Sequence, residues 1–182
     1  MSLELENQVK LLEEQLKQLQ GKQAKDQISI IVFSGDLDKV LASMIIATGA
    51  RAMDTEVKMF FTFWGTTMLR DKNKSPKGKD FMSKMFGFML PKGSTKLKLS
   101  KLNMGGMGTM MLKGLMKKKN VSSLEDLVKI AGEMGVEINI CQMSMDLMGF
   151  KKEEMIDYPN IKYVGVGSYL ADAGESKVQL FI

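Results

Sequence analysis

Apolar runs of strand length alternate with amphipathic stretches of helix length over residues 28–182. Hydrophobic periodicity predicts strands at residues 28–33, 57–63, 136–140, 161–166 and 177–182. It predicts helices between them, at residues 37–53, 122–134, 144–148 and 168–173. Strands that alternate with helices indicate an α/β fold with a mostly parallel sheet of about five strands, covered on both faces.

Two of these helices carry specific signals. The helix at 37–53 has an apolar stripe through Leu41, Met44, Ile45 and Thr48, which we expect to face the sheet. The helix at 122–134 begins with Ser122, and Glu125 follows three residues later. This spacing is a capping-box signature, so we expect Ser122 to cap the helix.

Residues 1–21 form a separate pattern, joined to the domain by a linker at 22–27. Apolar residues recur there at alternating spacings of four and three, which places them on one seam of a helix: Leu5, Val9, Leu12, Leu16 and Leu19. We predict a coiled-coil-like helix. It either lies on the domain at 28–182 or associates with a second copy.

A basic insertion at about 70–119 interrupts the alternation of strands and helices. It contains 14 Lys/Arg and 2 Asp/Glu residues, and we expect two short helices in it, near 79–89 and 106–118. Methionines recur at helical spacing in both, which is typical of a core or subunit-interface stripe. The alternative is a basic amphipathic surface for an anionic membrane or an acidic partner. Nucleic acid is not expected, because the lysines lack interleaved arginines and aromatic stacking platforms.

The composition of the 182 residues excludes several kinds of site. The chain has no histidine and one cysteine, so no Cys–His pair, internal disulfide or imidazole zinc site can form within it. Gly105, Gly106 and Gly108 lie close together but lack the nucleotide-binding spacings. We therefore expect no metal and no cofactor. Because no secretory signal or long apolar run is evident, we expect a cytoplasmic protein, with peripheral membrane contact left open.

The single cysteine, Cys141, is the clearest candidate for covalent chemistry. It follows a predicted strand and precedes a short helix, and backbone N–H groups at a helix start favour the thiolate. A lone thiolate can accept a sulfur atom as a persulfide and pass it to a partner thiol. The alternative is an inert cysteine that fills a gap in the core.

Loops at the carboxyl ends of parallel strands meet at one edge of the sheet, where ligands usually bind. Beside Cys141 we therefore expect pocket residues from three such loops: Ser34, Gly35, Asp36, Phe63, Trp64, Gly65, Gln142, Met143 and Ser144. Asp36 also suits the start of the helix at 37–53, so its loop either caps that helix or faces a ligand.

Four motifs, in order, resemble the second DsrE subgroup of the DsrE/DsrF-like sulfur-relay proteins, often labelled peroxiredoxin-like. They are Ser34–Lys39, Phe60–Gly65, Lys101–Gly108 and Cys141–Gly149. The resemblance covers about residues 28–182 and leaves the N-terminal helix outside.

The resemblance implies a flavodoxin-like fold, homo-oligomers and sulfur trafficking through a persulfide on the residue that matches Cys141. The implied partners are sulfur donor and acceptor proteins or small persulfides. Some relatives carry a second cysteine that this chain lacks, and some are membrane-associated. We therefore expect a sulfurtransferase or sulfur carrier. The alternative is a non-catalytic oligomeric protein that binds a small ligand.

Overall fold

The computed structural model describes residues 7–15, 24–75 and 81–182. Residues 7–15 are helical and all of them are exposed, including Val9 and Leu12 of the predicted seam. The other seam positions and most of the linker lie outside the described residues. Whether the helix associates with a second copy therefore stays a prediction.

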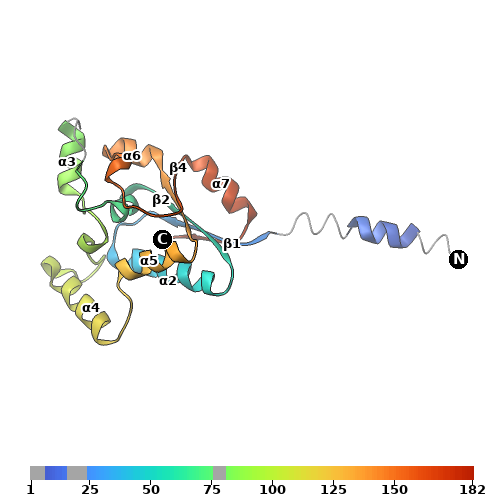
Figure 1. Cartoon of the computed structure of the whole chain (residues 1–182), viewed down its shortest axis with the longest axis horizontal. Helices are drawn as coiled ribbons and strands as arrows, with labels where there is room; N and C mark the ends of the chain where they lie inside the picture. The colour runs from blue at the N-terminus through green and yellow to red at the C-terminus, as the bar shows by residue number, and fades with distance from the viewer. Residues whose placement is uncertain (1–6, 16–23, 76–80) are drawn as a thin grey trace.

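The described chain from residue 24 onwards contains one five-stranded sheet, as the alternating pattern predicts (Figure 1). Its strands lie in the order β4-β3-β2-β1-β5, and every pairing is parallel. The last strand of the chain thus pairs with the first. The strand bounds are β1 (Lys25–Val32), β2 (Glu56–Phe61), β3 (Glu137–Cys141), β4 (Ile161–Val164) and β5 (Ser176–Phe181).

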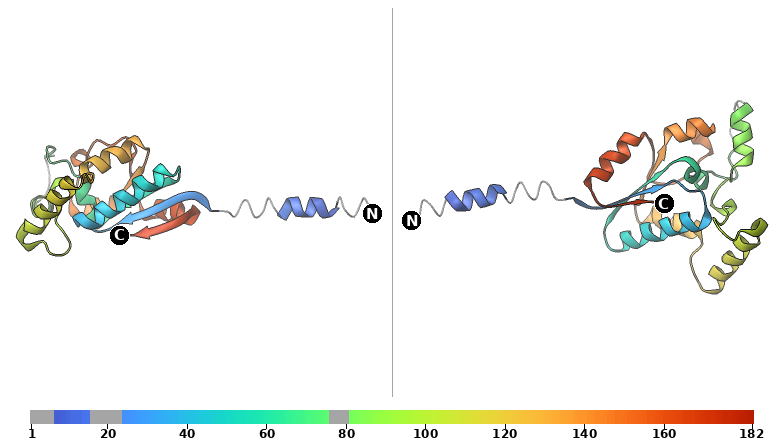
Figure 2. Two further views of the ribbon diagram at one scale, coloured as in Figure 1. Left: turned by 90° about the horizontal axis from the view of Figure 1, so that it is seen from below. Right: turned by 180° about the vertical axis from the view of Figure 1, so that it is seen from behind.

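Helices cover both faces of this sheet, which confirms the predicted α/β class. Figures 1 and 2 show α2 (Leu37–Ala52) and α5 (Leu124–Glu133) on one side. The same views place α6 (Gln142–Met148) and α7 (Val166–Glu175) on the other side. The short 3-10 helices are η1 (Phe63–Leu69), η2 (Ser94–Lys96), η3 (Met104–Gly106) and η4 (Lys152–Glu154).

The two faces of the sheet differ in polarity. Successive side chains of a strand point to opposite faces. One set is apolar and at most 1% exposed: Ile30, Val32, Val57, Met59, Ile138 and Ile140. The opposite set contains Gln27, Ser29, Lys58 and Asn139, and α7 supplies partners to it, such as Asp172 to Lys58. The apolar core therefore lies under α2 and α5, and the polar face lies under α6 and α7.

The buried stripe of α2 differs from the predicted one. Met44 is fully buried as expected, but Ile45 is 47% exposed. The helix instead buries Val40, Ser43 and Ala47, and the hydroxyl of Ser43 donates to the carbonyl of Val40 at 2.8 Å. A serine that satisfies its own helix can face the core, so small residues take the close contacts and the larger Ile45 remains outside.

The capping box of α5 lies one residue later than predicted. Ser123, not Ser122, is the N-cap, and its hydroxyl accepts the backbone N–H of Asp126 at 3.1 Å. The Asp126 carboxylate in turn accepts the backbone N–H of Ser123. An aspartate can close this reciprocal pair as a glutamate does, which explains the shift in register.

The basic insertion contains the two expected helices, α3 (Phe81–Met89) and α4 (Met107–Lys118). Neither lies in the core: α3 has no buried residue, and Gly108 is the buried residue of α4. Their apolar side chains are largely exposed, among them Phe81, Phe88, Met89, Met107, Met110 and Met111. Within the described residues, no helix has both the length and the apolar composition to cross a bilayer.

Side-chain contacts at both ends of the insertion help attach it to the domain. Arg70 is 3% exposed, and its guanidinium donates to the Glu154 carboxylate at 3.2 and 3.3 Å. The same group donates to the carbonyls of Gly87, Leu90 and Pro91, which end α3. Further along, Asp38 of α2 accepts both the amide and the hydroxyl of Ser100.

Candidate functional site

Cys141 ends β3 and is also the N-cap of α6, so the structure places it at a strand-to-helix junction. Its backbone is extended, with φ −65° and ψ 110°, and its side chain makes no capping hydrogen bond. The junction lies at the carboxyl edge of the parallel sheet, where β2 and β4 flank β3. The sequence therefore located the turn correctly.

The side chain of Cys141 belongs to the polar face of the sheet. Asn139, two residues earlier, pairs in register with Phe60, whose ring lies 5.4 Å from that of Tyr169 in α7. Because side chains alternate along a strand, Cys141 points to the same side as Asn139. The thiol therefore faces the layer that α6 and α7 form, away from the apolar core.

A buried pair of hydroxyl groups lies next to Cys141. Phe61 pairs with Ile140, so the following residue, Thr62, lies beside Cys141. The Oγ1 of Thr62 is 2.8 Å from the Oγ of Ser144, in the first turn of α6. This hydrogen bond attaches the end of β2 to the helix that Cys141 caps.

The thiol is less accessible than the sequence interpretation requires. Cys141 is 3% exposed and forms no disulfide. Ser144, in the first turn of α6, is fully buried. A sulfur donor can thus reach the thiol only if α6 or its surroundings move.

Charged groups continue the polar face away from Cys141. Lys58 lies 2.6 Å from Asp172, and Lys162 lies 2.6 Å from Glu137. Asn139 donates from its amide nitrogen to Glu137 at 2.9 Å, while its buried amide oxygen has no hydrogen-bond partner among the described residues. The face therefore carries alternating charges, and two buried acceptors on it, this oxygen and the Oε1 of Gln27, have no partner among the described residues.

These contacts shift the pKa values of the network. The hydrogen bond from Lys58 to Asp172 raises the pKa of the lysine above its ordinary value, against the opposing effect of burial. Burial alone would raise the pKa of Glu137, but hydrogen bonds from Lys162 and Asn139 outweigh it and lower that pKa. Both groups are consequently held in their charged forms.

The predicted residues of the first two loops meet in a cavity of about 330 Å³. Ser34, Gly35, Asp36 and Trp64 line it. The approach is close, since a Cβ on Gly35 would lie 2.7 Å from the carbonyl oxygen of Trp64. Cys141 does not line this cavity, so the structure brings the two loops together but does not add the thiol to their pocket.

The remaining predicted residues have separate roles. The ring of Phe63 packs against that of Phe33 in a tilted arrangement, with ring centroids 5.4 Å apart, and Gly65 packs against the carbonyl group of Val32. Gln142 and Met143 are exposed on α6, where Met143 is 57% exposed. Asp36 occupies the N-cap position of α2 and accepts the hydroxyl of Ser34, but its side chain makes no capping hydrogen bond to the helix and lines the cavity.

Sequence reasoning missed Thr62, Asn139 and Lys58, which share the face of Cys141. Strand alternation could have placed Asn139 and Cys141 together, because they are two residues apart in one strand. The register between strands, which brings Thr62 beside Cys141, has no signal in a single sequence. Among the described residues, no cluster of three acidic or sulfur ligands could hold a metal ion.

Comparisons with known proteins show the family and the fold of the chain. A model of the DsrE/DsrF/DrsH-like family matches residues 24–181. Protein YrkE of Bacillus subtilis is 50% identical over 154 residues, which cover 85% of this chain and 95% of YrkE. The sulfur carrier protein DsrE2 of Allochromatium vinosum is 36% identical over 162 residues, covering 85% of this chain and 97% of DsrE2.

The crystal structure of the ychN protein of E. coli has a similar fold. It superposes with a TM-score of 0.53 at 11% identity, covering 86% of this chain and 98% of that protein. At this identity the likeness concerns the fold alone. Together with the match over residues 24–181, these findings confirm the resemblance, and the chain belongs to the DsrE/DsrF/DrsH-like family.

Proposed function

We propose that the chain is a sulfur carrier that holds a sulfane sulfur as a persulfide on Cys141. The observation that carries the proposal is the position of the only cysteine at the β3–α6 junction, at the carboxyl edge of the sheet. The 36% identical relative is named a sulfur carrier protein, which supports the same role.

The transfer needs no cofactor and no net oxidation. The Cys141 thiolate attacks the outer sulfur of a donor persulfide, the donor's S–S bond breaks, and the donor leaves as a thiolate. An acceptor thiolate then attacks the outer sulfur on Cys141 and releases the Cys141 thiolate. Each step exchanges one S–S bond for another, so a single thiol suffices, and the absence of histidine from the sequence is no obstacle.

Burial of Cys141 adds a requirement to this scheme. We propose that α6, which ends at Gly149 in the left-handed conformation, moves away from the sheet when a donor or acceptor binds. The Thr62–Ser144 hydrogen bond is the contact that such a movement breaks. The carrier would then protect its persulfide from water and stray thiols between transfers.

Intact-mass measurement after incubation with polysulfide tests the proposal. Wild-type protein is expected to gain about 32 Da, the mass of one sulfur, and dithiothreitol should remove it. Cys141→Ser and wild type blocked with iodoacetamide under denaturing conditions and refolded serve as controls, and neither should gain mass. Absence of a gain on wild type, even after long incubation, would exclude the carrier role.

The second candidate function is an oligomeric protein that binds a small ligand without covalent chemistry. The 330 Å³ cavity at Ser34–Asp36 and Trp64 favours it, because Cys141 does not line that cavity. In this case Cys141→Ser should leave ligand binding and assembly unchanged, whereas Trp64→Ala should reduce ligand binding.

The exposed apolar residues of α3 and α4 favour peripheral membrane contact as a further property of the proposed carrier. Lys84 lies on α3, and Lys113, Lys117 and Lys118 lie on α4, so lysines accompany the methionines. Flotation with anionic vesicles would measure it. Binding should weaken as salt rises and should fall when Phe88 and Met89 are replaced by serine.

A further inference from the structure

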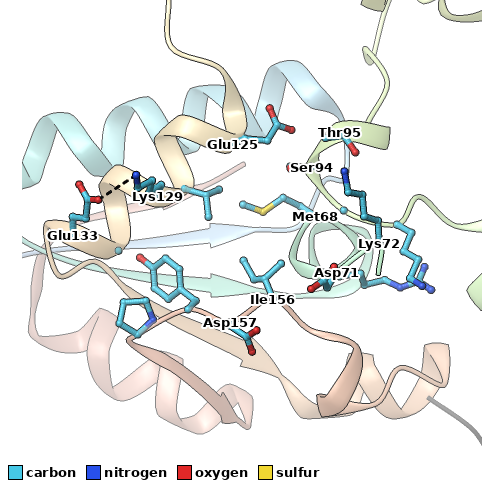
Figure 3. A pocket seen from close by; sticks show the side chains of 17 residues that line it. Met68, Asp71, Lys72, Ser94, Thr95, Glu125, Lys129, Glu133, Ile156 and Asp157 are labelled. Atoms are coloured by element: carbon cyan, nitrogen blue, oxygen red, sulfur yellow. Dashed lines mark ion pairs between the residues drawn. The ribbon is translucent and has the colours of Figure 1, made fainter. Parts of the chain in front are cut away.

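A cavity of about 530 Å³ lies apart from Cys141 and from every pocket residue that the sequence predicted. Four segments form its walls: the end of η1, the loop that enters η2, helix α5, and residues 156–159 (Figure 3). Its volume is in the range of small-molecule sites.

The floor of this cavity is apolar. Met68 is 1% exposed, and Figure 3 shows it beside Ile156, with Val128 of α5 also in the lining. Tyr158 adds the side of its ring, since its hydroxyl donates to the carbonyl of Val136 at 2.9 Å. These groups suit the apolar body of a ligand.

The walls are rigid because their strongest polar groups bond within the protein. Arg70 lines the cavity, but its guanidinium makes five hydrogen bonds to Glu154 and to three carbonyls. Gly132 packs against Tyr158 and Pro159, where a Cβ would lie 3.2 and 3.3 Å from their side chains. Arg70 is therefore part of the frame and does not offer its charge to a ligand.

Other polar groups of the lining are not used in this way: Lys72 and Lys92 lie on the loop wall, and Glu125 lies on α5. The loop wall also carries two acids, of which Asp157 pairs with Lys74 at 2.6 Å and Asp71 accepts the backbone N–H of Asn73. Lys72, Ser94 and Thr95 have side chains that make no hydrogen bond to any described residue, and Lys92 contacts a single serine hydroxyl. On α5, the Glu125 side chain makes no ion pair with a described residue, whereas Lys129 and Glu133 pair at 3.9 Å.

We propose that this cavity binds a small zwitterion with an apolar body, of the size of a short peptide with free ends. The carboxylate binds at Lys72 and Lys92, where the hydroxyls of Ser94 and Thr95 are also available. The ammonium group binds near Glu125, and the apolar side chains lie on Met68, Val128 and Ile156. The proposal does not depend on sulfur transfer, because Cys141 lies outside the cavity.

Titration calorimetry of the full-length protein with the tripeptide Leu-Ala-Leu tests the proposal. Three matched probes are used: the free peptide, its N-acetyl form and its C-terminal amide. Each cap removes one charge, and exposed ion pairs contribute up to about 1 kcal/mol, so each cap should weaken binding by up to about fivefold.

Variants of the protein test which wall of the cavity binds each charged end of the peptide. With Lys72→Gln and Lys92→Gln together, the amide and the free peptide should bind alike; with Glu125→Gln, the acetylated and free peptides should bind alike. Lys101→Gln, in the same insertion but outside the cavity, should change nothing. Val128→Trp should abolish binding by filling the cavity. No saturable binding of the free peptide, or binding that survives Val128→Trp, would overturn the proposal.

Discussion

At the scale of single residues, the position of Cys141 agrees with the prediction from the sequence, but its accessibility to solvent does not. Cys141 lies at the predicted junction, yet only 3% of its surface is exposed. The position follows from the order of strand and helix in the sequence. The burial depends on the tertiary packing around the junction, where Thr62 and Ser144 are hydrogen-bonded, and local sequence does not encode that packing.

Slow modification of Cys141 in the folded protein is the first expected outcome. Because the thiol is buried, an aromatic disulfide reagent should react at least ~100-fold more slowly with native than with urea-unfolded protein. Thr62→Ala removes the hydrogen bond to Ser144 and should speed the native reaction. Equal rates for folded and unfolded wild type would show that the thiol is accessible.

Arg70 and Glu154 form a buried ion pair, and we expect that breaking it lowers the free energy of unfolding more than the other proposed substitutions. Arg70→Met removes the cation beside a carboxylate that is 1% exposed, and should lower the free energy of unfolding by about 3–5 kcal/mol. Urea titration measures it. Replacing both residues, Arg70→Met with Glu154→Leu, should recover part of the loss. A loss below about 1 kcal/mol for Arg70→Met would contradict the assignment.

At the scale of elements, the sequence predicted the helices and strands better than their contacts. The bounds of α3 and α4 agree closely with the predicted 79–89 and 106–118. The predicted apolar stripe of α2 was wrong in part, because Ser43 and Ala47 face the core at positions where larger residues were expected. Hydrophobicity alone cannot predict that a small residue in close contact with the sheet is buried while an isoleucine at the edge of the helix is exposed.

The capping box of α5 gives a prediction with a control in the adjacent residue. Ser123→Ala removes the side chain that accepts the Asp126 amide and should cost about 1 kcal/mol of unfolding free energy. Ser122→Ala should change it by less than ~0.5 kcal/mol, since Ser122 is exposed and outside the cap. If the two variants lose equal stability, Ser123 is not the cap.

Acid should weaken the contact between α2 and the insertion. Burial tends to raise the pKa of Asp38, but hydrogen bonds from Ser100 outweigh it, and the pKa lies below the ordinary value of 3.8. A carboxylate with a lowered folded-state pKa stabilises the fold above its unfolded pKa, and this contribution disappears as pH falls through the folded-state value. The stability difference between wild type and Asp38→Asn should therefore be constant from pH 7 to about 5 and shrink towards pH 3. A difference that does not change with pH would contradict it.

At the scale of the whole molecule, the family domain and the N-terminal helix are distinct. The family match begins at residue 24, and the helical residues 7–15 precede it. The family could be predicted from the four sequence motifs, and the parallel sheet could be predicted from the alternation of strand and helix patterns. The separation of Cys141 from the cavity at Trp64 could not, because it depends on which strands are neighbours.

We propose that the N-terminal helices of two copies pair in parallel. In a Cys141→Ser background, Leu12→Cys gives one thiol on the seam and Glu14→Cys gives one on the outer face. A parallel, in-register pair brings the seam positions within disulfide distance, so Leu12→Cys should cross-link about tenfold faster. Non-reducing electrophoresis measures it, and equal rates at the two positions would rule out the pairing.

The pairing of β5 with β1 affects how the chain folds during synthesis on the ribosome. The first strand to emerge borders the last, because Ile28 pairs with Val178 and Ile31 pairs with Phe181. One edge of β1 therefore remains unpaired until β5 has been synthesised and has left the exit tunnel. Until then, the exposed backbone N–H and C=O groups on that edge of β1 are available to pair with strands of other chains.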